Sequence, residues 1–349
     1  MFYDARNGAG RLFVIPKPPD HLGRTMRTAK LLIASAIALS ALVSAALPSA
    51  AQSWPTRPVR VMLPLGAGSG ADIGARLIAE KLSAKWGQPV VIENRPGGDG
   101  FVAITAFVSA RDDHTLFFGP AASFTAHPYL HDKLPYDPRD LAPVARVSAT
   151  LIALTVPPQL NVASLRDLFA MVKAQPGKMN WASVTGATDV VIAAFLKREG
   201  LDMAKVPYRD PVQAVNDVAE GRLQFYWASL AIVRGAIEAG RLKLLAMTSS
   251  EPSPVMPGVP TAKQAGFPGL TFDGLVGFYG MRDMPNELRE KIATDVRAAM
   301  SDPAIIKRFE ATGQEVVPGS AAEFAADIEK QSVGAAENAK VLGIKAAGH

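Results

Sequence analysis

The sequence predicts an α/β protein with parallel sheets that is divided into two lobes. Short apolar segments alternate along most of the chain with amphipathic segments of about ten to fifteen residues, a pattern typical of strand–helix–strand units. The chain of 349 residues is long enough for two domains, and its 48% hydrophobic and 20% charged residues allow a large core. It contains no cysteine, so a disulfide-stapled fold is excluded.

The net charge of +5 is concentrated at the start of the chain. Residues 1–51 contain six basic and only two acidic residues, so the remaining chain is close to neutral. No run of lysine and arginine with interleaved aromatic residues follows. We therefore expect no nucleic-acid partner.

Residues 26–51 are interpreted as a secretory signal peptide. A short cationic start (26–30) precedes an uncharged run (31–47) and a small-residue site that ends at Ala51, which predicts Sec-type export with cleavage near Ala51. The alternative is a membrane anchor, because the run could nearly span a bilayer. Residues 1–25 are expected to be an extension of no structural role, with Met26 as the true start.

The elements of the mature chain follow from hydrophobic periodicity. In the segment 72–85, apolar residues recur at Ile73, Leu77, Ile78 and Leu82, the spacing of one buried helix face. By the same criteria, further helices are predicted at 165–174, 189–199, 212–220, 287–300 and 321–342. Strands are predicted at 59–64, 89–92, 115–118, 144–156 (one or two strands), 180–184, 223–226 and 242–248.

The first strand leads into a glycine-rich loop, Gly66–Gly70, and then a helix. This arrangement presents backbone N–H groups and the positive end of a helix dipole to an anion. The loop also fits a loose dinucleotide fingerprint, but Asp72 would repel a pyrophosphate, so we expect no cofactor. Two interpretations of Asp72 remain open at this point, a helix cap and a ligand contact.

The chain resembles the Bug-type receptors of tripartite tricarboxylate transporters (the TctC-like group). The resemblance rests on colinear segments that cover essentially the whole mature chain: 58–64, 68–72, 87–97, 134–138, 206–208, 259–261 and the small-residue loop around Ser183. It implies a two-lobed periplasmic-binding-protein (Venus flytrap, type II-like) fold. The implied division is 52–153 with 277–349 for the first lobe and 154–276 for the second.

The resemblance also implies a function. The protein would be a periplasmic, monomeric receptor that binds a small carboxylate between its lobes and delivers it to the membrane subunits of such a transporter, or reports it to a sensor. Two loops with neighbouring positions would hold the ligand, and the expected ligand-binding residues are Pro64, Leu65, Gly68, Ser69, Gly70, Ala71, Asp72, Ser123, Ser183, Val184, Thr185, Gly186, Thr188 and Ala228.

Several positions depart from the family pattern. Val191 stands where the family has a histidine, Ala228 where it commonly has an aspartate, and Leu275 where a tryptophan is expected. These changes predict a more apolar pocket, suited to an aromatic or apolar monocarboxylate. If Asp72 and Asp189 both faced the cleft, a ligand with an ammonium group would be favoured instead.

Catalysis is not predicted. His127 and His131 have helical spacing, but Pro128 lies between them, so we expect no shared helix face and no metal site. Ser69 is not flanked by the glycines that a nucleophile elbow requires. The alternative function is an exported enzyme on the same scaffold, such as a hydrolase of small carboxyl compounds.

Overall fold

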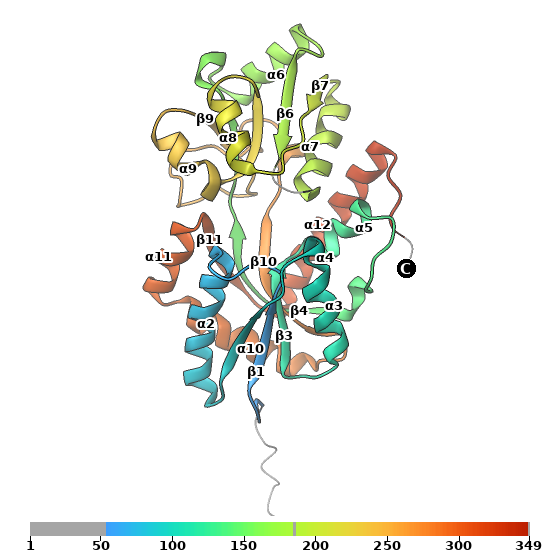
Figure 1. Cartoon of the computed structure of the whole chain (residues 1–349), viewed down its shortest axis with the longest axis vertical. Helices are drawn as coiled ribbons and strands as arrows, with labels where there is room; N and C mark the ends of the chain where they lie inside the picture. The colour runs from blue at the N-terminus through green and yellow to red at the C-terminus, as the bar shows by residue number, and fades with distance from the viewer. Residues whose placement is uncertain (1–53, 184–185, 348–349) are drawn as a thin grey trace, which may run out of the picture. The chain divides into compact units, whose positions relative to one another are not determined.

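The computed structural model describes residues 54–183 and 186–347, and Figure 1 shows their arrangement. The predicted leader and its cleavage site lie outside these residues. Within the described ranges, none of the helices combines the length and the apolar character that a membrane span requires.

The strands form two mixed sheets. The first sheet has six strands in the order β11-β4-β10-β3-β1-β2, and the second has five in the order β7-β6-β8-β5-β9. The strands of the first sheet are β1 (Val59–Leu63), β2 (Val90–Asn94), β3 (Thr115–Pro120), β4 (Leu141–Thr150), β10 (Gly274–Met281) and β11 (Gln314–Gly319). Those of the second are β5 (Ile152–Val156), β6 (Met179–Ser183), β7 (Met203–Lys205), β8 (Phe225–Ser229) and β9 (Lys243–Met247).

Helices surround each sheet. Those that accompany the first sheet are α2 (Gly70–Trp86), α3 (Phe101–Ala110), α4 (Ala122–Thr125), α5 (His127–Leu130), α10 (Asn286–Met300), α11 (Pro303–Ala311) and α12 (Ala321–Leu342). Those that accompany the second are α6 (Leu165–Ala174), α7 (Gly186–Glu199), α8 (Pro211–Ala219) and α9 (Leu230–Glu238). The two-lobed α/β fold is thus confirmed, and α12 also packs against α7.

The expectation of parallel sheets is confirmed only in part, because both sheets are mixed. β1 runs parallel to β2 and β3, and β6 runs parallel to β7 and β8, but β10 is antiparallel to β3 and β4, and β5 is antiparallel to β8 and β9. The reason is that the chain crosses between the two sheets. β5 and β10 are the first strands after a crossing, so each begins at the edge of its sheet that faces the crossing. β1, β3, β4, β6 and β8 end at that edge and therefore run in the opposite direction.

The crossing falls close to the predicted lobe limits. Only Leu151 separates β4 from β5, and the chain returns to the first sheet with β10, which begins at Gly274. The positions at which the chain passes from one sheet to the other therefore differ by a few residues from the expected lobe limits at 153 and 277. The assignment of residues to lobes beyond these strands stays a prediction.

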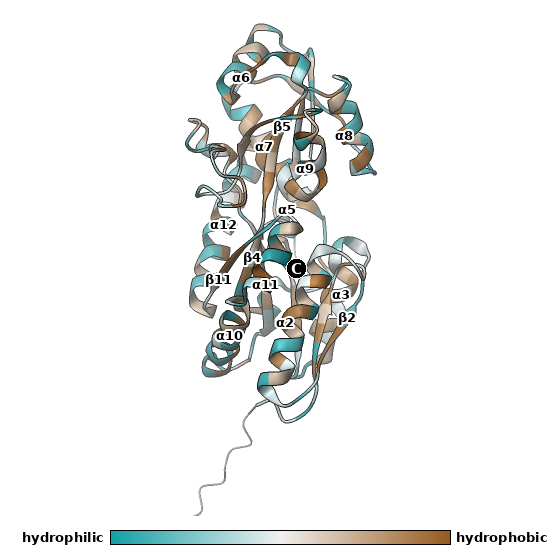
Figure 2. Cartoon of the chain, turned by 90° about the vertical axis from the view of Figure 1, so that its left-hand side faces the viewer, coloured by the Kyte–Doolittle hydropathy of each residue, from teal (hydrophilic) through white to brown (hydrophobic). Residues whose placement is uncertain are grey.

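Each sheet is covered on both faces by apolar helix faces. In the first, Val61 and Leu63 pack with residues of α2, α10 and α11, while Met62 and Phe117 on the opposite face pack with α3 and α12. In the second, one cluster includes residues of α6 and α7 and the other includes residues of α8 and α9. Figure 2 shows the hydrophobic strands and the hydrophilic outer turns of α10. Alternation of side chains along each strand produces this division.

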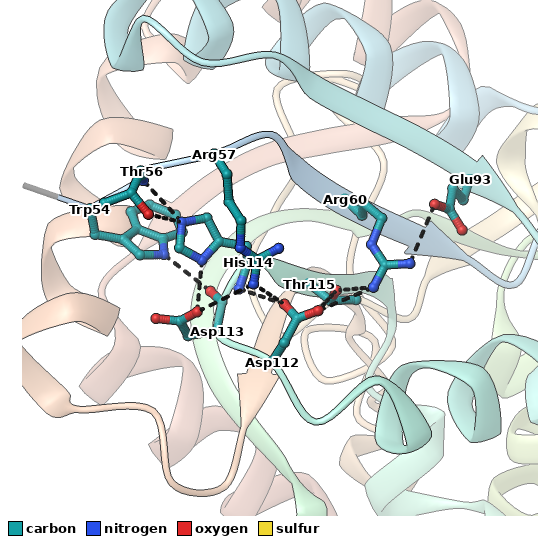
Figure 3. A network of polar contacts seen from close by, with 9 residues as sticks. All are labelled: Trp54, Thr56, Arg57, Arg60, Glu93, Asp112, Asp113, His114 and Thr115. Atoms are coloured by element: carbon teal, nitrogen blue, oxygen red, sulfur yellow. Dashed lines mark hydrogen bonds and ion pairs between the residues drawn. The ribbon is translucent and has the colours of Figure 1, made fainter.

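A polar network lies at the amino ends of β1 and β3, away from the loops that end these strands (Figure 3). Arg60 donates to Asp112 at 3.1 Å and to Thr115 at 2.9 Å, and the backbone N–H of His114 donates to Asp112 at 2.8 Å. Arg57 adds an ion pair to Asp112 at 3.4 Å. The network ties the segment before β1 to the turn before β3.

Candidate functional site

Two loops that follow parallel strands lie at the ends of the strands nearest the crossing between sheets. One connects β1 to α2 and contains Pro64 to Ser69; the other connects β6 to α7 and ends at Gly186. The carboxyl ends of parallel strands are where α/β folds place their ligands. These are the two loops in which most of the expected ligand-binding residues lie.

The start of α2 is fixed by two reciprocal hydrogen bonds. Ser69 is the N-cap, and its Oγ accepts from the N–H of Asp72 at 3.3 Å. The carboxylate of Asp72 accepts in return from the N–H of Gly68 at 2.8 Å. Gly68 has φ +82°, in the left-handed region that glycine adopts without strain. The loop is therefore held in shape by its own residues and by Asn94 of β2, whose side-chain amide donates to the Leu65 carbonyl at 2.9 Å.

The negative charge of Asp72 is compensated within the protein. Only 2% of Asp72 is exposed; Arg76 donates to it at 3.1 Å and Asn94 at 2.8 Å. Burial acts to raise the pKa of Asp72, but the hydrogen bonds from Arg76, Gly68 and Asn94 outweigh it and hold that pKa below its ordinary value. Of the two interpretations left open by the sequence, the structure favours the structural one, with Asp72 at the third helical position and not at the cap itself.

Of the other residues expected to bind the ligand in this segment, some are exposed to solvent and some are packed in the protein. Leu65 is 41% exposed and Gly68 is exposed, whereas Pro64 is buried. Gly70 does not face open space, because a Cβ at this position would lie 2.9 Å from the Cβ of Thr312. Ala71 packs into the core beneath α2. Gly70 and Ala71 therefore pack against other parts of the protein. The glycine pattern alone did not indicate this packing.

The second loop is described only in part, because Val184 and Thr185 lie outside the described residues. The Ser183 hydroxyl donates to the Asp189 carboxylate, and Lys205 donates to the same carboxylate at 2.6 Å. Thr188 is fully buried. The charge of Asp189, like that of Asp72, is therefore compensated by a basic side chain.

The two isolated site predictions, Ser123 and Ala228, are both buried. Ser123 in α4 is 2% exposed, and its carbonyl accepts from the Tyr136 hydroxyl at 2.9 Å. Ala228 is fully buried among the apolar side chains beside α8 and α9. The sequence placed Ala228 after a strand that was expected to end at Tyr226, but β8 continues to Ser229 and carries Ala228 into the core.

A cavity of about 400 Å³ opens beside the crossing strands. It is lined by residues of β4, β10 and β11 of the first sheet, by the segment that follows β9, by α7 and by α12, among them Ala187, Val190, Val191 and Leu275. Among the described residues, those expected to bind the ligand do not line it, but Val191 and Leu275, two of the positions that predicted an apolar pocket, do. The contribution of α12 could not be predicted from the sequence, because that contact joins segments far apart in the chain.

The cavity carries more acidic than basic groups. Its lining includes the acidic residues Glu251, Asp273, Glu315 and Asp327 and the basic residues Arg146 and Lys330. Arg146 is paired with Asp327. An unpaired carboxylate ligand would meet like charges here, so we do not place the charged end of a carboxylate in this cavity.

The fold brings together His127 and His131, for which no shared helix face and no metal site were expected. His127 begins α5 and His131 follows it, with ring centroids 5.5 Å apart. The two residues do not share a helix face, as expected, because α5 ends at Leu130 and His131 has extended backbone, but the turn still places their rings side by side. Asp99 lies beside both rings. Burial lowers the pKa of His127 to about 4.

Comparisons with known proteins agree with the two-lobed fold. Residues 74–339 match the family model described as "Tripartite tricarboxylate transporter family receptor". The chain is 29% identical to the protein BugT of Bordetella pertussis over 290 residues, which cover 81% of this chain and 89% of that protein.

Two similar solved structures contain ligands. One is an R. palustris protein with adipate, 28% identical, with a TM-score of 0.69 and coverage of 84% of this chain and 99% of that chain. The other is MatC from Rhodopseudomonas palustris with bound malate, 26% identical, with a TM-score of 0.64 and coverage of 82% of this chain and 99% of that chain.

Proposed function

The chain belongs to the family of tripartite tricarboxylate transporter receptors, whose members are periplasmic solute-binding proteins, and from this premise we propose that it captures a small carboxylate between its two lobes. The carboxylate would be held by the loops at the starts of α2 and α7. The first-turn N–H groups of a helix have no acceptor within the helix, and the dipole favours an anion there.

One observation carries this proposal. Each of the two helix starts has an aspartate, and each aspartate is paired: Asp72 with Arg76 at 3.0 Å, and Asp189 with Lys205 at 2.6 Å. An uncompensated carboxylate at either place would repel an anion, and two would favour an ammonium group. With both charges compensated, the positive ends of the helices remain available to an anionic ligand.

The finer proposal concerns the ligand's apolar part. Beyond its first turn, α7 presents Val190 and Val191 to the cavity, and Leu275 of β10 lines the same cavity. These side chains offer van der Waals contact and no hydrogen bond. They support an aromatic or apolar monocarboxylate, with its charged end at the loops and its apolar end toward these residues.

The remaining parts of the proposal follow from the family. The protein would be exported with removal of its leader near Ala51, act as a monomer in the periplasm, and pass its ligand unchanged to membrane transporter subunits or to a sensor. Binding would favour the closed arrangement of the lobes, because only that arrangement lets both loops contact one ligand.

A ligand screen tests this function. Benzoate, branched aliphatic monocarboxylates, adipate, malate and citrate are added to the purified protein, and the midpoint of thermal unfolding is measured. A ligand that binds only the folded state raises the midpoint. We expect the monocarboxylates to raise it most and to be recovered unchanged. Tighter binding of di- or tricarboxylates in calorimetry would contradict the ligand class, and turnover of any compound would contradict the receptor function in favour of an exported hydrolase.

A further inference from the structure

Three side chains with metal-binding atoms converge on one point beside the start of α5. Asp99 lies in the turn Gly98–Gly100 that follows β2, and His127 and His131 flank Pro128 to Leu130. The Asp99 Oδ2 atom lies 3.0 Å from Nε2 of His131 and 3.6 Å from Nε2 of His127. The ligand atoms of all three residues lie within 4.8 Å of one another.

The hydrogen-bond chain behind His127 determines which of its ring nitrogens carries a proton. The Tyr136 hydroxyl has a single proton and donates it to the carbonyl of Ser123 at 2.9 Å. Nδ1 of His127 lies 2.8 Å from the same hydroxyl oxygen, so Nδ1 must be the donor in that contact. In the uncharged ring, which burial favours, Nε2 then carries only a lone pair.

That lone pair faces a carboxylate oxygen. Nε2 of His127 and Oδ2 of Asp99 are both acceptors in this arrangement, and they lie 3.6 Å apart. The side chain of His127 is only 6% exposed. A buried acceptor that faces another acceptor is unfavourable, and a cation between the two would convert the repulsion into two bonds.

The distances suit a tetrahedral metal ion. Zinc bonds of about 2.0–2.2 Å to nitrogen and oxygen place neighbouring ligand atoms about 3.3 Å apart. The two separations from Asp99, 3.0 Å and 3.6 Å, lie on either side of this value. Two imidazoles with one carboxylate suit late first-row divalent metals, whereas magnesium and calcium prefer oxygen ligands alone.

We propose that Asp99, His127 and His131 form a binding site for a late first-row divalent metal ion, with zinc as its probe. Tyr136 and the Ser123 carbonyl hold the His127 ring from behind, the usual support of a metal-bound histidine. The Phe101 ring packs edge-on against both imidazoles, with centroids 5.2 Å from His127 and 4.6 Å from His131. The 59% exposure of the Asp99 side chain leaves a side open for a water ligand.

The site would brace segments next to both candidate ligand loops. A Cβ on Gly100, adjacent to Asp99, would lie 3.3 Å from Pro64, where the first loop begins. A Cβ on Gly186, at the start of α7, would lie 2.8 Å from Leu130 of α5. A metal that joins the Asp99 turn to α5 therefore fixes the two elements that these loops touch.

Zinc binding by the purified protein, made without a histidine tag and stripped with a chelator, tests the proposal. Competition with a chromophoric chelator should show one zinc ion bound per chain. Asp99→Asn and His131→Gln, both at partly exposed positions, should each weaken binding by about 100-fold or more, and Tyr136→Phe by about 10- to 100-fold.

Asp113→Asn is the matched control, because it removes an exposed carboxylate that lies 2.7 Å from a single histidine, His114. Its zinc affinity should equal that of the unaltered protein. Circular dichroism melts check that each variant is folded. Absence of a saturable site, or unchanged affinity in the folded Asp99→Asn and His131→Gln variants, would overturn the proposal.

Discussion

The carboxylate of Asp72 accepts a hydrogen bond from the backbone N–H of Gly68 at 2.8 Å, while Asp72 itself is almost wholly buried. This contact closes the β1–α2 loop on the helix that follows it. Together with the Ser69 cap and the hydrogen bond from Asn94 to the Leu65 carbonyl, it determines the shape of the loop and with it the direction of the helix N–H groups.

Asp72→Ala should therefore destabilise the fold by about 2–4 kcal/mol, because Arg76, Asn94 and the Gly68 N–H lose a buried partner. Asp167 is a matched control. It occupies the same position of α6, accepts from the Ala163 N–H at 3.0 Å, and is exposed. Asp167→Ala should cost only about 0.5–1 kcal/mol. Urea unfolding measures both, and equal losses would contradict the account.

Gly70 and Thr312 are predicted to be coupled through packing. A Cβ on Gly70 would lie 2.9 Å from the Cβ of Thr312, so Gly70→Ala should destabilise the protein by about 1–3 kcal/mol. Thr312→Gly removes the obstructing atoms. In the double variant, the loss should be smaller than the sum of the two single losses, as a double-mutant cycle of unfolding free energies would show. Additive losses would contradict the prediction, because they would mean that Thr312 is not what excludes a side chain at Gly70.

Asp112 should make stability depend on pH in the acid range. Burial acts to raise its pKa, but the hydrogen bonds from His114, Thr115 and Arg60 and the charge of Arg57 hold that pKa below its ordinary value. A lowered folded pKa means that the unfolded chain binds the proton first. The stabilisation is therefore complete above the unfolded pKa of about 3.9 and is lost as pH falls through the folded value.

The measurement is urea unfolding at several pH values between about 2 and 6, with Asp112→Asn for comparison. The variant should be less stable than the unaltered protein at pH 6, and the difference should shrink toward pH 2. A constant difference across this range would show that the charge of Asp112 contributes nothing.

Local signals predicted several elements with their observed limits. The helices at 165–174 and 321–342 were predicted from apolar periodicity alone and are confirmed as α6 and α12. Both begin at serine N-caps, Ser164 and Ser320, and the second has a complete capping box with Glu323. Periodicity and capping agree in these segments, so sequence neighbours suffice to define them.

The failures have non-local causes. The Asp72 partner Asn94 comes from β2, and the Gly70 neighbour Thr312 follows α11, so no pattern near residue 70 could show that these positions are occupied by packing. The strands β7, β10 and β11 and the helices α3, α4, α5, α9 and α11 were not predicted. β10 returns from the other lobe, and its pairing with β4 is visible only once the chain has crossed.

The closeness of the two histidine rings was not visible from the sequence either. His127 and His131 do not share a helix face, as expected, because α5 ends at Leu130, but the turn still brings the two rings together. The third member of that cluster, Asp99, comes from the turn after β2, and the sequence offered no signal that would connect the two segments.

The central claim, that a carboxylate binds at the β1–α2 loop, is tested most directly by charge at Gly66. A Cβ at this exposed glycine meets no atom within 4 Å, so a side chain fits there without strain. Calorimetry compares Gly66→Asp with its neutral counterpart Gly66→Asn, and with Gly334→Asp, an equally open position that lines the cavity. With the carboxylate of highest affinity, Gly66→Asp should bind about tenfold or more weakly than Gly66→Asn, and Gly334→Asp should bind normally. Equal affinities of the two Gly66 variants, with a loss in Gly334→Asp, would contradict the claim and place the carboxylate in the cavity.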